Sequence, residues 1–74
     1  MKKTQVKIST EYIKLDQLLK FSGICENGSS AKELILDGIV LVNGEVCLLR
    51  GKKIRAGDTV LIDLGNETIE LAVI

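Results

Sequence analysis

Four basic side chains lie close together in the middle of the chain. Residues 50 to 55 read RGKKIR, with no carboxylate between the four cations Arg50, Lys52, Lys53 and Arg55. Like charges at this spacing repel one another unless an anion lies opposite them. Phosphate suits the cluster best, because an arginine can bind two phosphate oxygens at once and a lysine adds a mobile point charge. The pattern therefore favours a partner that carries phosphates.

The remaining charges are divided unevenly along the chain. The sequence has 10 basic and 10 acidic residues, yet five lysines fall in the first 20 positions, and the segment from Ala56 onward has four acids and no base. Asp58, Asp63 and Glu67 are the carboxylates that could neutralise the cluster internally. Exposed ion pairs of that kind contribute only about 0–1 kcal/mol each, so we expect the cations to face an external anion.

The composition argues against catalysis and against a bound metal. The chain has no histidine, which is the usual general acid or base, and its two cysteines cannot supply the four ligands of a structural zinc site. We therefore expect no enzyme activity, no cofactor or metal, and no small-molecule substrate. Cys25 and Cys47 are expected to be reduced structural residues.

The length of 74 residues predicts one domain spanning residues 1–74. No apolar run approaches the roughly 20 residues that cross a bilayer, and the lysines near the start are not followed by the apolar stretch of a secretory signal. We expect a cytoplasmic protein that does not associate with membranes and is a monomer.

The first half of the sequence predicts one strand followed by two helices. Residues 5–9 alternate between polar and apolar, which is the period of a half-buried strand. Residues 14–22 repeat leucine at helical spacing before a glycine, which predicts a helix. Ser30 and Glu33 have the spacing of a capping box, which predicts a second helix that ends at Gly38. The residues of that helix expected to face inward are Ala31, Leu34 and Ile35.

The second half has the two-residue period of strands. Asn43-Gly44 lies between IVLV and EVCLL, and this dipeptide is the strongest short-range signal for a hairpin turn. Turns near residues 56–58 and 65–66 introduce TVLID and TIELAVI. The residues of the hairpin expected to face inward are Val40, Val42 and Val46. The order predicts an α+β fold in which a two-helix hairpin packs on a small, mostly antiparallel β-sheet.

Taken together, four segments of the chain resemble a known family. In order, KLDQLLK, AKELI, GIVLVNGE and KIRAGDTV are similar to the small RNA-binding domain first described in ribosomal small-subunit protein four, also called the alpha-L motif. The resemblance covers about residues 14 to 62. The length looks like that of the stand-alone bacterial members, which consist of this domain alone. The resemblance implies the α+β fold and binding to structured RNA, often ribosomal.

The resemblance also assigns individual residues to the RNA-binding surface. Lys14 stands where the family has its first arginine, and Ser29 stands where it has a serine before the second helix. Lys53 and Arg55 fall in a segment where the family is often basic. With the other cations of the cluster and of the helix ends, the expected RNA-binding residues are Lys14, Lys20, Ser29, Lys32, Arg50, Lys52, Lys53 and Arg55.

At one position the chain departs from the family. Gly28 occupies the place of the family's middle arginine, and we expect Lys32, one turn further along, and the backbone of Gly28 and Ser29 to take over that contact. Tyr12 and Phe21 are the only aromatic residues, and Phe21 is expected in the core. Few aromatic side chains are therefore available to stack on RNA bases, so we expect the protein to recognise phosphates and the shape of the RNA.

The expected function is that of a non-catalytic protein that binds structured, ribosomal RNA through phosphate contacts in ribosome assembly or translation. Two alternatives stay open. A protein-interaction module would turn the same cations toward an acidic partner, and partners that survive ribonuclease treatment would favour it. A β-grasp sulfur carrier also has a VNGE hairpin and a late GD turn, but it needs a flexible C-terminal Gly-Gly, whereas this chain ends in LAVI.

Overall fold

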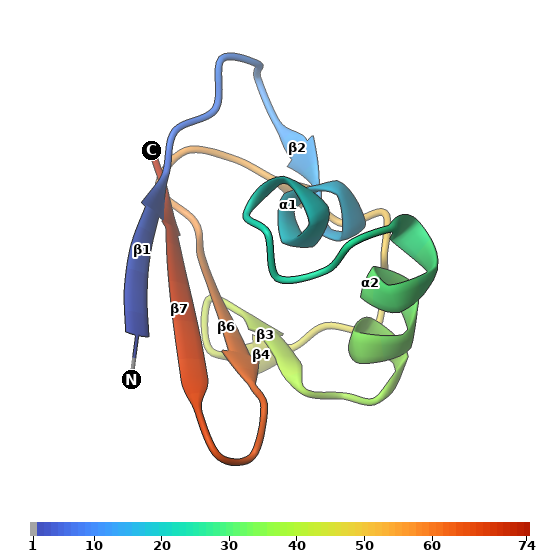
Figure 1. The fold of residues 1–74 in the computed structure, drawn as a ribbon. Coiled ribbons are helices and arrows are strands. Elements are labelled where there is room, and N and C mark those ends of the chain that lie inside the picture. Colours follow the sequence, from blue (N-terminus) through green and yellow to red (C-terminus); the bar gives the residue numbers. More distant parts are fainter. Residues whose placement is uncertain (1) are drawn as a thin grey trace.

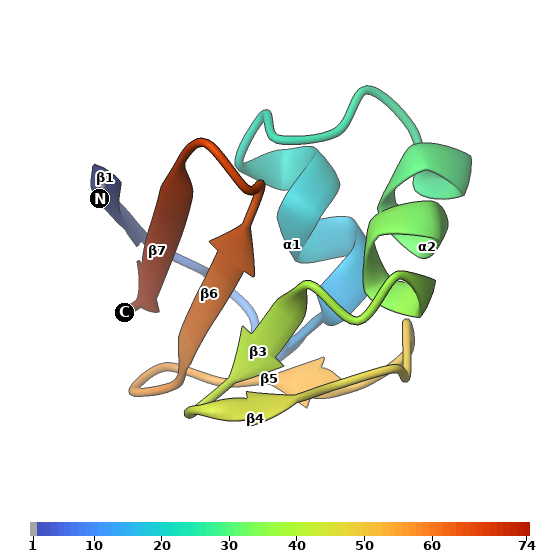
Figure 2. The same cartoon turned by 90° about the horizontal axis from the view of Figure 1, so that it is seen from below.

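The computed structural model describes residues 2 to 74, which form two helices on one side of a five-stranded sheet (Figures 1 and 2). The elements in chain order are β1 (Lys2–Val6), β2 (Ile13–Lys14), α1 (Leu15–Phe21), α2 (Gly28–Leu36), β3 (Val40–Val42), β4 (Glu45–Val46), β5 (Lys53–Ile54), β6 (Thr59–Asp63) and β7 (Thr68–Val73). The predicted α+β class, a helix hairpin on a mostly antiparallel sheet, is confirmed. Neither helix in this part of the chain has the length and apolar character needed to cross a membrane.

The main sheet has the strand order β1-β7-β6-β3-β4, and β2 and β5 form a separate two-stranded pair. Every neighbouring pair in the main sheet is antiparallel except β1 and β7, which are parallel. Opposite residues share a face of a sheet. The register places Val6 opposite Val73, Val60 opposite Leu71 and Val40 opposite Ile62, so these side chains all point toward the helices.

The core is a single apolar cluster between this sheet face and the two helices. Leu15, Leu18 and Leu19 of α1 are fully buried, as are Ala31 and Ile35 of α2. Leu34, the third member of the predicted inner stripe, packs against the cluster while partly exposed. The strand residues of the core are Val6, Val40, Val42, Ile54, Val60, Ile62, Leu71 and Val73.

Two predicted element boundaries were wrong. The first strand spans Lys2–Val6 rather than residues 5–9. The second helix begins at Gly28, and the Asn27 side chain caps it by accepting a hydrogen bond from the Ser30 backbone N–H at 2.9 Å. Asparagine is as effective an N-cap as serine, and it occurs one turn earlier. Ser30 therefore lies inside the first turn, and the predicted capping box does not form.

Two residues expected to face inward do not. Phe21 is 66% exposed and Val46 is 56% exposed. Phe21 comes two residues after the buried Leu19, and two residues of an α-helix turn the side chain by about 200°, away from the core. Val46 lies opposite Leu41 in the β3–β4 register, so it shares the outer face with Leu41 rather than the inner face with Val40 and Val42.

Candidate nucleic-acid interface

The β4–β5 connection (residues 47–52) is fixed against the start of α1 by main-chain hydrogen bonds. The N–H of Leu15 donates to the carbonyl of Lys52 at 2.9 Å, and the N–H of Asp16 donates to the carbonyl of Arg50 at 3.0 Å. The first N–H groups of a helix have no acceptor within the helix itself. The connection supplies these acceptors, and in doing so it holds two cations of the predicted cluster beside the helix pair.

The β2–β5 pair brings a cation from each end of the predicted site together. Its register places Lys14 directly opposite Lys53 and Ile13 opposite Ile54. Ile54 is fully buried, which anchors the pair to the core, while both lysines are exposed. Like charges directly opposite each other destabilise a strand pair. An anion bound over the two ammonium groups would remove this repulsion.

The ring of Tyr12 contacts Lys53 and one further cation, Arg55. The Lys53 ammonium nitrogen lies 5.0 Å from the centre of the Tyr12 ring, and the Arg55 guanidinium carbon lies 6.0 Å from it. Cations within about 6 Å of an aromatic ring centre are attracted by its face. The sequence did not assign Tyr12 to the site. In the structure its ring groups Lys53 and Arg55 with Lys14, which is two residues further along the same extended segment.

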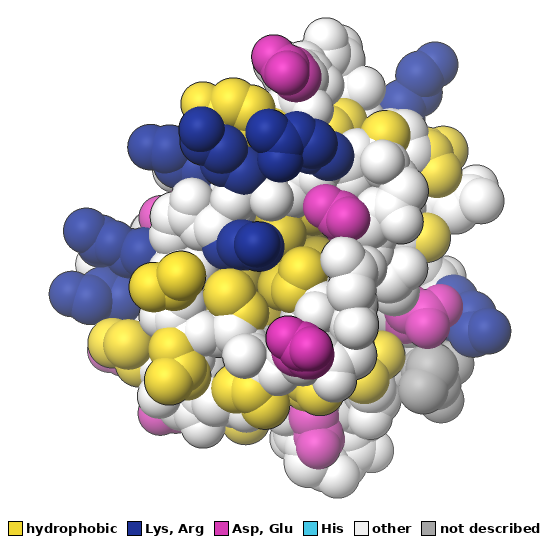
Figure 3. All heavy atoms as spheres, turned by 180° about the vertical axis from the view of Figure 1, so that it is seen from behind, with side chains coloured by type: hydrophobic (Ala, Val, Ile, Leu, Met, Phe, Trp, Pro, Cys, Tyr) yellow, Lys and Arg dark blue, Asp and Glu magenta, His cyan; other side chains and the backbone are white. Residues whose placement is uncertain are grey.

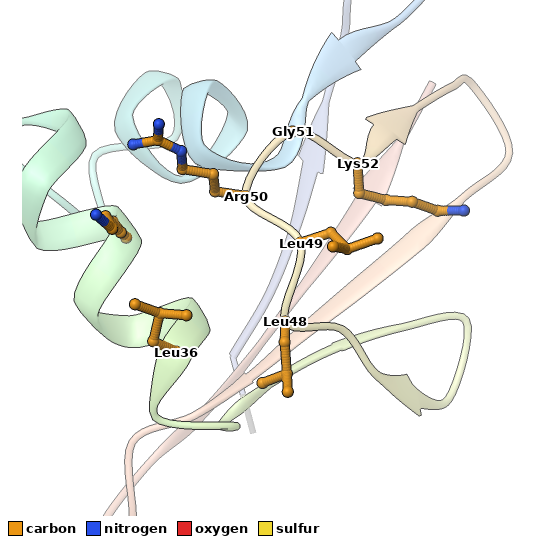
Figure 4. A pocket seen from close by; sticks show the side chains of 7 residues that line it. Leu36, Leu48, Leu49, Arg50, Gly51 and Lys52 are labelled. Carbon is orange, nitrogen blue, oxygen red and sulfur yellow. The ribbon is translucent and has the colours of Figure 1, made fainter.

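A second group of cations surrounds a hollow between α2 and the β4–β5 connection. The hollow has a volume of about 510 Å³, and Figure 4 shows the side chains that line it. Three cations line it together with three leucines and one glycine: Lys32, Arg50, Lys52, Leu36, Leu48, Leu49 and Gly51. Helix α2 and the β4–β5 connection therefore contribute cations to one surface.

Six of the eight predicted site residues fall into these two groups, and we call them the basic face: Lys14, Lys32, Arg50, Lys52, Lys53 and Arg55. All six are exposed. Figure 3 shows a band of Lys and Arg side chains across one side of the molecule, with isolated acidic side chains around it. Lys20, in the last turn of α1, and Ser29, in the first turn of α2, are also exposed, but neither lines the hollow between α2 and the β4–β5 connection, which we call the leucine hollow.

Asp58 joins the segment that carries Arg55 to the β3–β4 hairpin. Its carboxylate accepts hydrogen bonds from the Arg55 backbone N–H at 2.8 Å and from the Asn43 side-chain amide at 3.1 Å. Asn43 in turn accepts from the Thr59 N–H at 2.9 Å. The sequence assigned Asn43 only to its turn and treated Asp58 as a possible ion-pair partner. The VNG and GD motifs that contain these residues are instead linked to each other, and together they fix the backbone of Arg55.

These contacts lower the pKa of Asp58. The backbone hydrogen bond from Arg55 is the largest cause and the Asn43 amide is the next, with smaller contributions from the positive charges of Lys52 and Arg55. A carboxylate with a lowered pKa in the folded state stabilises the fold above its unfolded pKa of about 3.9. That contribution is lost as the pH falls through the lowered folded value.

The Asp58 contacts predict a pH-dependent loss of stability on substitution. Asp58→Asn should lower the free energy of unfolding by about 1 kcal/mol at pH 7, because charged hydrogen-bond acceptors are stronger than neutral ones. The difference from wild type should begin to shrink below about pH 4, where Asp58 of the unfolded chain takes up a proton, and should be lost as the pH falls through the lowered folded pKa. Urea unfolding at pH 7 and pH 3 measures it, with Glu45→Gln on the exposed strand β4 as the control. An equal difference at both pH values would contradict this role.

Comparison with known proteins places the chain in a family. A model of the S4 domain matches residues 6–72. The chain therefore belongs to the S4 domain family, the RNA-binding family that its motifs resemble.

The similar proteins are, by name, a ribosome maturation protein and a heat shock protein. The chain is 40% identical over 58 residues to the probable ribosome maturation protein RlbA of Bacillus subtilis (strain 168), and the match covers 78% of this chain and 82% of that protein. Among solved structures it is similar to the trimeric heat shock protein 15 of Vibrio cholerae, with a TM-score of 0.69 and 22% identity. That match covers 78% of this chain and 58% of the other, and it supports the shared fold.

Proposed function

We propose that this protein is a non-catalytic RNA-binding protein that holds structured ribosomal RNA through its phosphates during ribosome maturation. The observation that carries the proposal is the basic face, on which Lys14 and Lys53 stand directly opposite each other. Membership of the S4 domain family supports RNA as the ligand. The name of the Bacillus subtilis relative supports ribosome maturation as the setting.

The arrangement suits the backbone of a folded RNA. The cations come from three separate segments, namely β2, α2 and residues 50–55. The A-form helix presents phosphates and 2′-hydroxyls across a wide minor groove, and proteins read it largely by shape. Cations held at fixed positions on a rigid surface can match the positions of phosphates along such a helix. At Gly28 a β-carbon would meet no atom within 4 Å, so crowding does not explain the absence of the family's arginine there, and Lys32 lies one turn away.

The salt dependence of binding tests the proposal. If four to six phosphates are contacted, log K should fall with log salt with a slope of roughly 0.7–0.9 per contact. Between 50 and 200 mM salt the affinity for a ribosomal RNA hairpin should then fall by about two to three orders of magnitude. Fluorescence anisotropy with a labelled hairpin measures this. An affinity that stays flat over this range would rule out phosphate contacts as the basis of binding.

A protein-interaction module remains the second candidate, because the same cations would suit an acidic partner. Partners recovered from cells with and without ribonuclease treatment separate the two. Loss of the partners on digestion supports RNA as the ligand, and partners that persist support the alternative.

A further inference from the structure

The leucine hollow on the basic face has features that phosphate contacts alone do not require. Its leucines are largely exposed to solvent: Leu36 by 58%, Leu48 by 54% and Leu49 by 68%. Single exposed apolar residues are common on protein surfaces, but several that lie together often mark a binding site. The volume of about 510 Å³ falls in the range of roughly 300–1,000 Å³ that is typical of sites for small chemical groups.

The hollow is held open by the backbone of the β4–β5 connection. Besides the two hydrogen bonds to the start of α1, the Lys52 N–H donates to the Leu49 carbonyl at 3.1 Å, and the Cys47 N–H donates to the Val40 carbonyl at 2.9 Å. These bonds fix both ends of the segment that carries Leu48 and Leu49. The backbone that carries the leucines is therefore fixed outside the core, and a ligand would find the main chain of the site already in place.

The charges around the hollow restrict the ligand. Lys32, Arg50 and Lys52 line it, and no carboxylate among residues 2–74 does so. A ligand that suits both features has an apolar part for the leucines and negative charge on either side of it. RNA offers this combination where a base is unpaired, because the base has two apolar faces and is flanked by phosphates. A base stacked within a duplex cannot enter, since its faces are covered by its neighbours.

We propose that the leucine hollow receives one unpaired nucleobase of the bound RNA, while Lys32, Arg50 and Lys52 hold the flanking phosphates. The inference rests on the proposed RNA-binding function. RNA is favoured over an acidic peptide because Lys52, which lines the hollow, adjoins Lys53 in the chain, and Lys53 lies over the Tyr12 ring. The hollow is therefore next to the cations around Tyr12. The phosphate backbone could continue from one group to the other.

Two RNA hairpins with the same stem test the inference, one fully paired and one with a single bulged nucleotide. Wild type should bind the bulged hairpin about tenfold more tightly, because removing roughly 50–60 Å² of apolar surface from water on binding corresponds to about that factor. The double variant Leu48→Ser/Leu49→Ser should lose the preference and bind both hairpins as wild type binds the paired one. Leu64→Ser, at a leucine outside the hollow that is 39% exposed, should keep the preference. Circular dichroism confirms that each variant is folded.

A second readout does not depend on affinity. With 4-thiouridine at the bulge, photocrosslinking should attach the RNA to the peptides that line the hollow, which contain residues 48–52 or residues 32–36. Equal binding of both hairpins by wild type, a preference that survives in the double variant, or crosslinks elsewhere would each overturn the inference, while salt-dependent binding would still support the proposed function. If neither hairpin binds, the proposed function itself fails. A synthetic acidic, leucine-rich peptide that binds wild type but not the double variant, with no hairpin preference, would assign the hollow to a protein partner and overturn the inference.

Discussion

Replacing Lys52, Lys53 and Arg55 together by glutamate is expected to abolish RNA binding while leaving the fold intact. The change removes three cations from the centre of the basic face and places three carboxylates there, facing the phosphates. Like charges placed against each other across an interface cost several kcal/mol, so the affinity should fall by at least about 10³-fold. All three side chains are exposed, so the cost to stability comes mainly from the lost Tyr12 contacts, about 0.5–1 kcal/mol each, and from the lost attraction of Lys52 and Arg55 to Asp58.

The matched control carries the same change in charge on another part of the surface. Lys2, Lys3 and Lys7 are exposed on β1 and just after it. Strand β1 is the edge of the main sheet opposite β4, and in Figure 1 it lies across the molecule from α2. Changing these three to glutamate should weaken binding only modestly. Fluorescence anisotropy with one RNA hairpin compares both variants with wild type. If the β1 variant lost as much affinity as the other, binding would depend on overall charge rather than on this face.

Ile54→Ala is expected to destabilise the domain more than any change on the surface. Ile54 is fully buried, lies opposite Ile13 in the β2–β5 pair, and joins the cation-bearing segment to the core. Truncating a buried isoleucine to alanine costs about 2–5 kcal/mol, because the removed atoms leave a cavity. A domain of this size has a total stability of roughly 4–11 kcal/mol, so the change removes a large part of it.

Urea unfolding measures the effect, and two variants calibrate it. Ile54→Val keeps most of the volume and should cost about 0.5–1.5 kcal/mol. Leu64→Ala removes a leucine that is exposed in the β6–β7 turn and should change stability by no more than about 0.5 kcal/mol. A loss below 1 kcal/mol in Ile54→Ala would show that β5 is not anchored to the core as described.

Local sequence signals predicted the local elements well. At the predicted Asn43-Gly44 turn, the structure shows φ of 51° and 88°, the positive values that a two-residue hairpin turn of this kind requires. The leucine spacing predicted α1 within a residue at either end. In each case the residues that form the sequence pattern also make the contacts that stabilise the element. The local sequence was therefore sufficient to predict these two elements.

Features that depend on distant contacts could not be predicted in the same way. The parallel pairing of β1 with β7 joins the two ends of the chain, and no local period records a partner. The segment EVCLL was expected to be a strand throughout, yet the strand covers only Glu45–Val46, with one further bond from the Cys47 N–H to β3. The chain then leaves the sheet and leads into residues 50–52, where the carbonyl groups of Arg50 and Lys52 accept the free N–H groups of α1. These contacts with α1 exist only in the folded chain.

The same distinction holds for the site. The sequence identified the cations, because residue type alone gives the charge of a side chain. The grouping of those cations depends on residues elsewhere in the chain. Tyr12, the Asn43–Asp58 link and the leucine hollow were not predicted, although the VNG and GD motifs were a usable signal for the link. Lys20 was predicted from its place near a helix end and Ser29 from the pattern of the family, and neither lines the leucine hollow.

Mapping the RNA contact on the folded protein tests the central claim most directly. In amide NMR spectra recorded during titration with a ribosomal RNA hairpin, signals of residues 12–15, 32–36 and 48–56 should shift or broaden together. Signals of β1 and of the β6–β7 turn should stay unchanged. Changes centred on β1 or on that turn, with residues 48–56 unaffected, would contradict the claim that the cations around Tyr12 and the leucine hollow form one RNA-binding face.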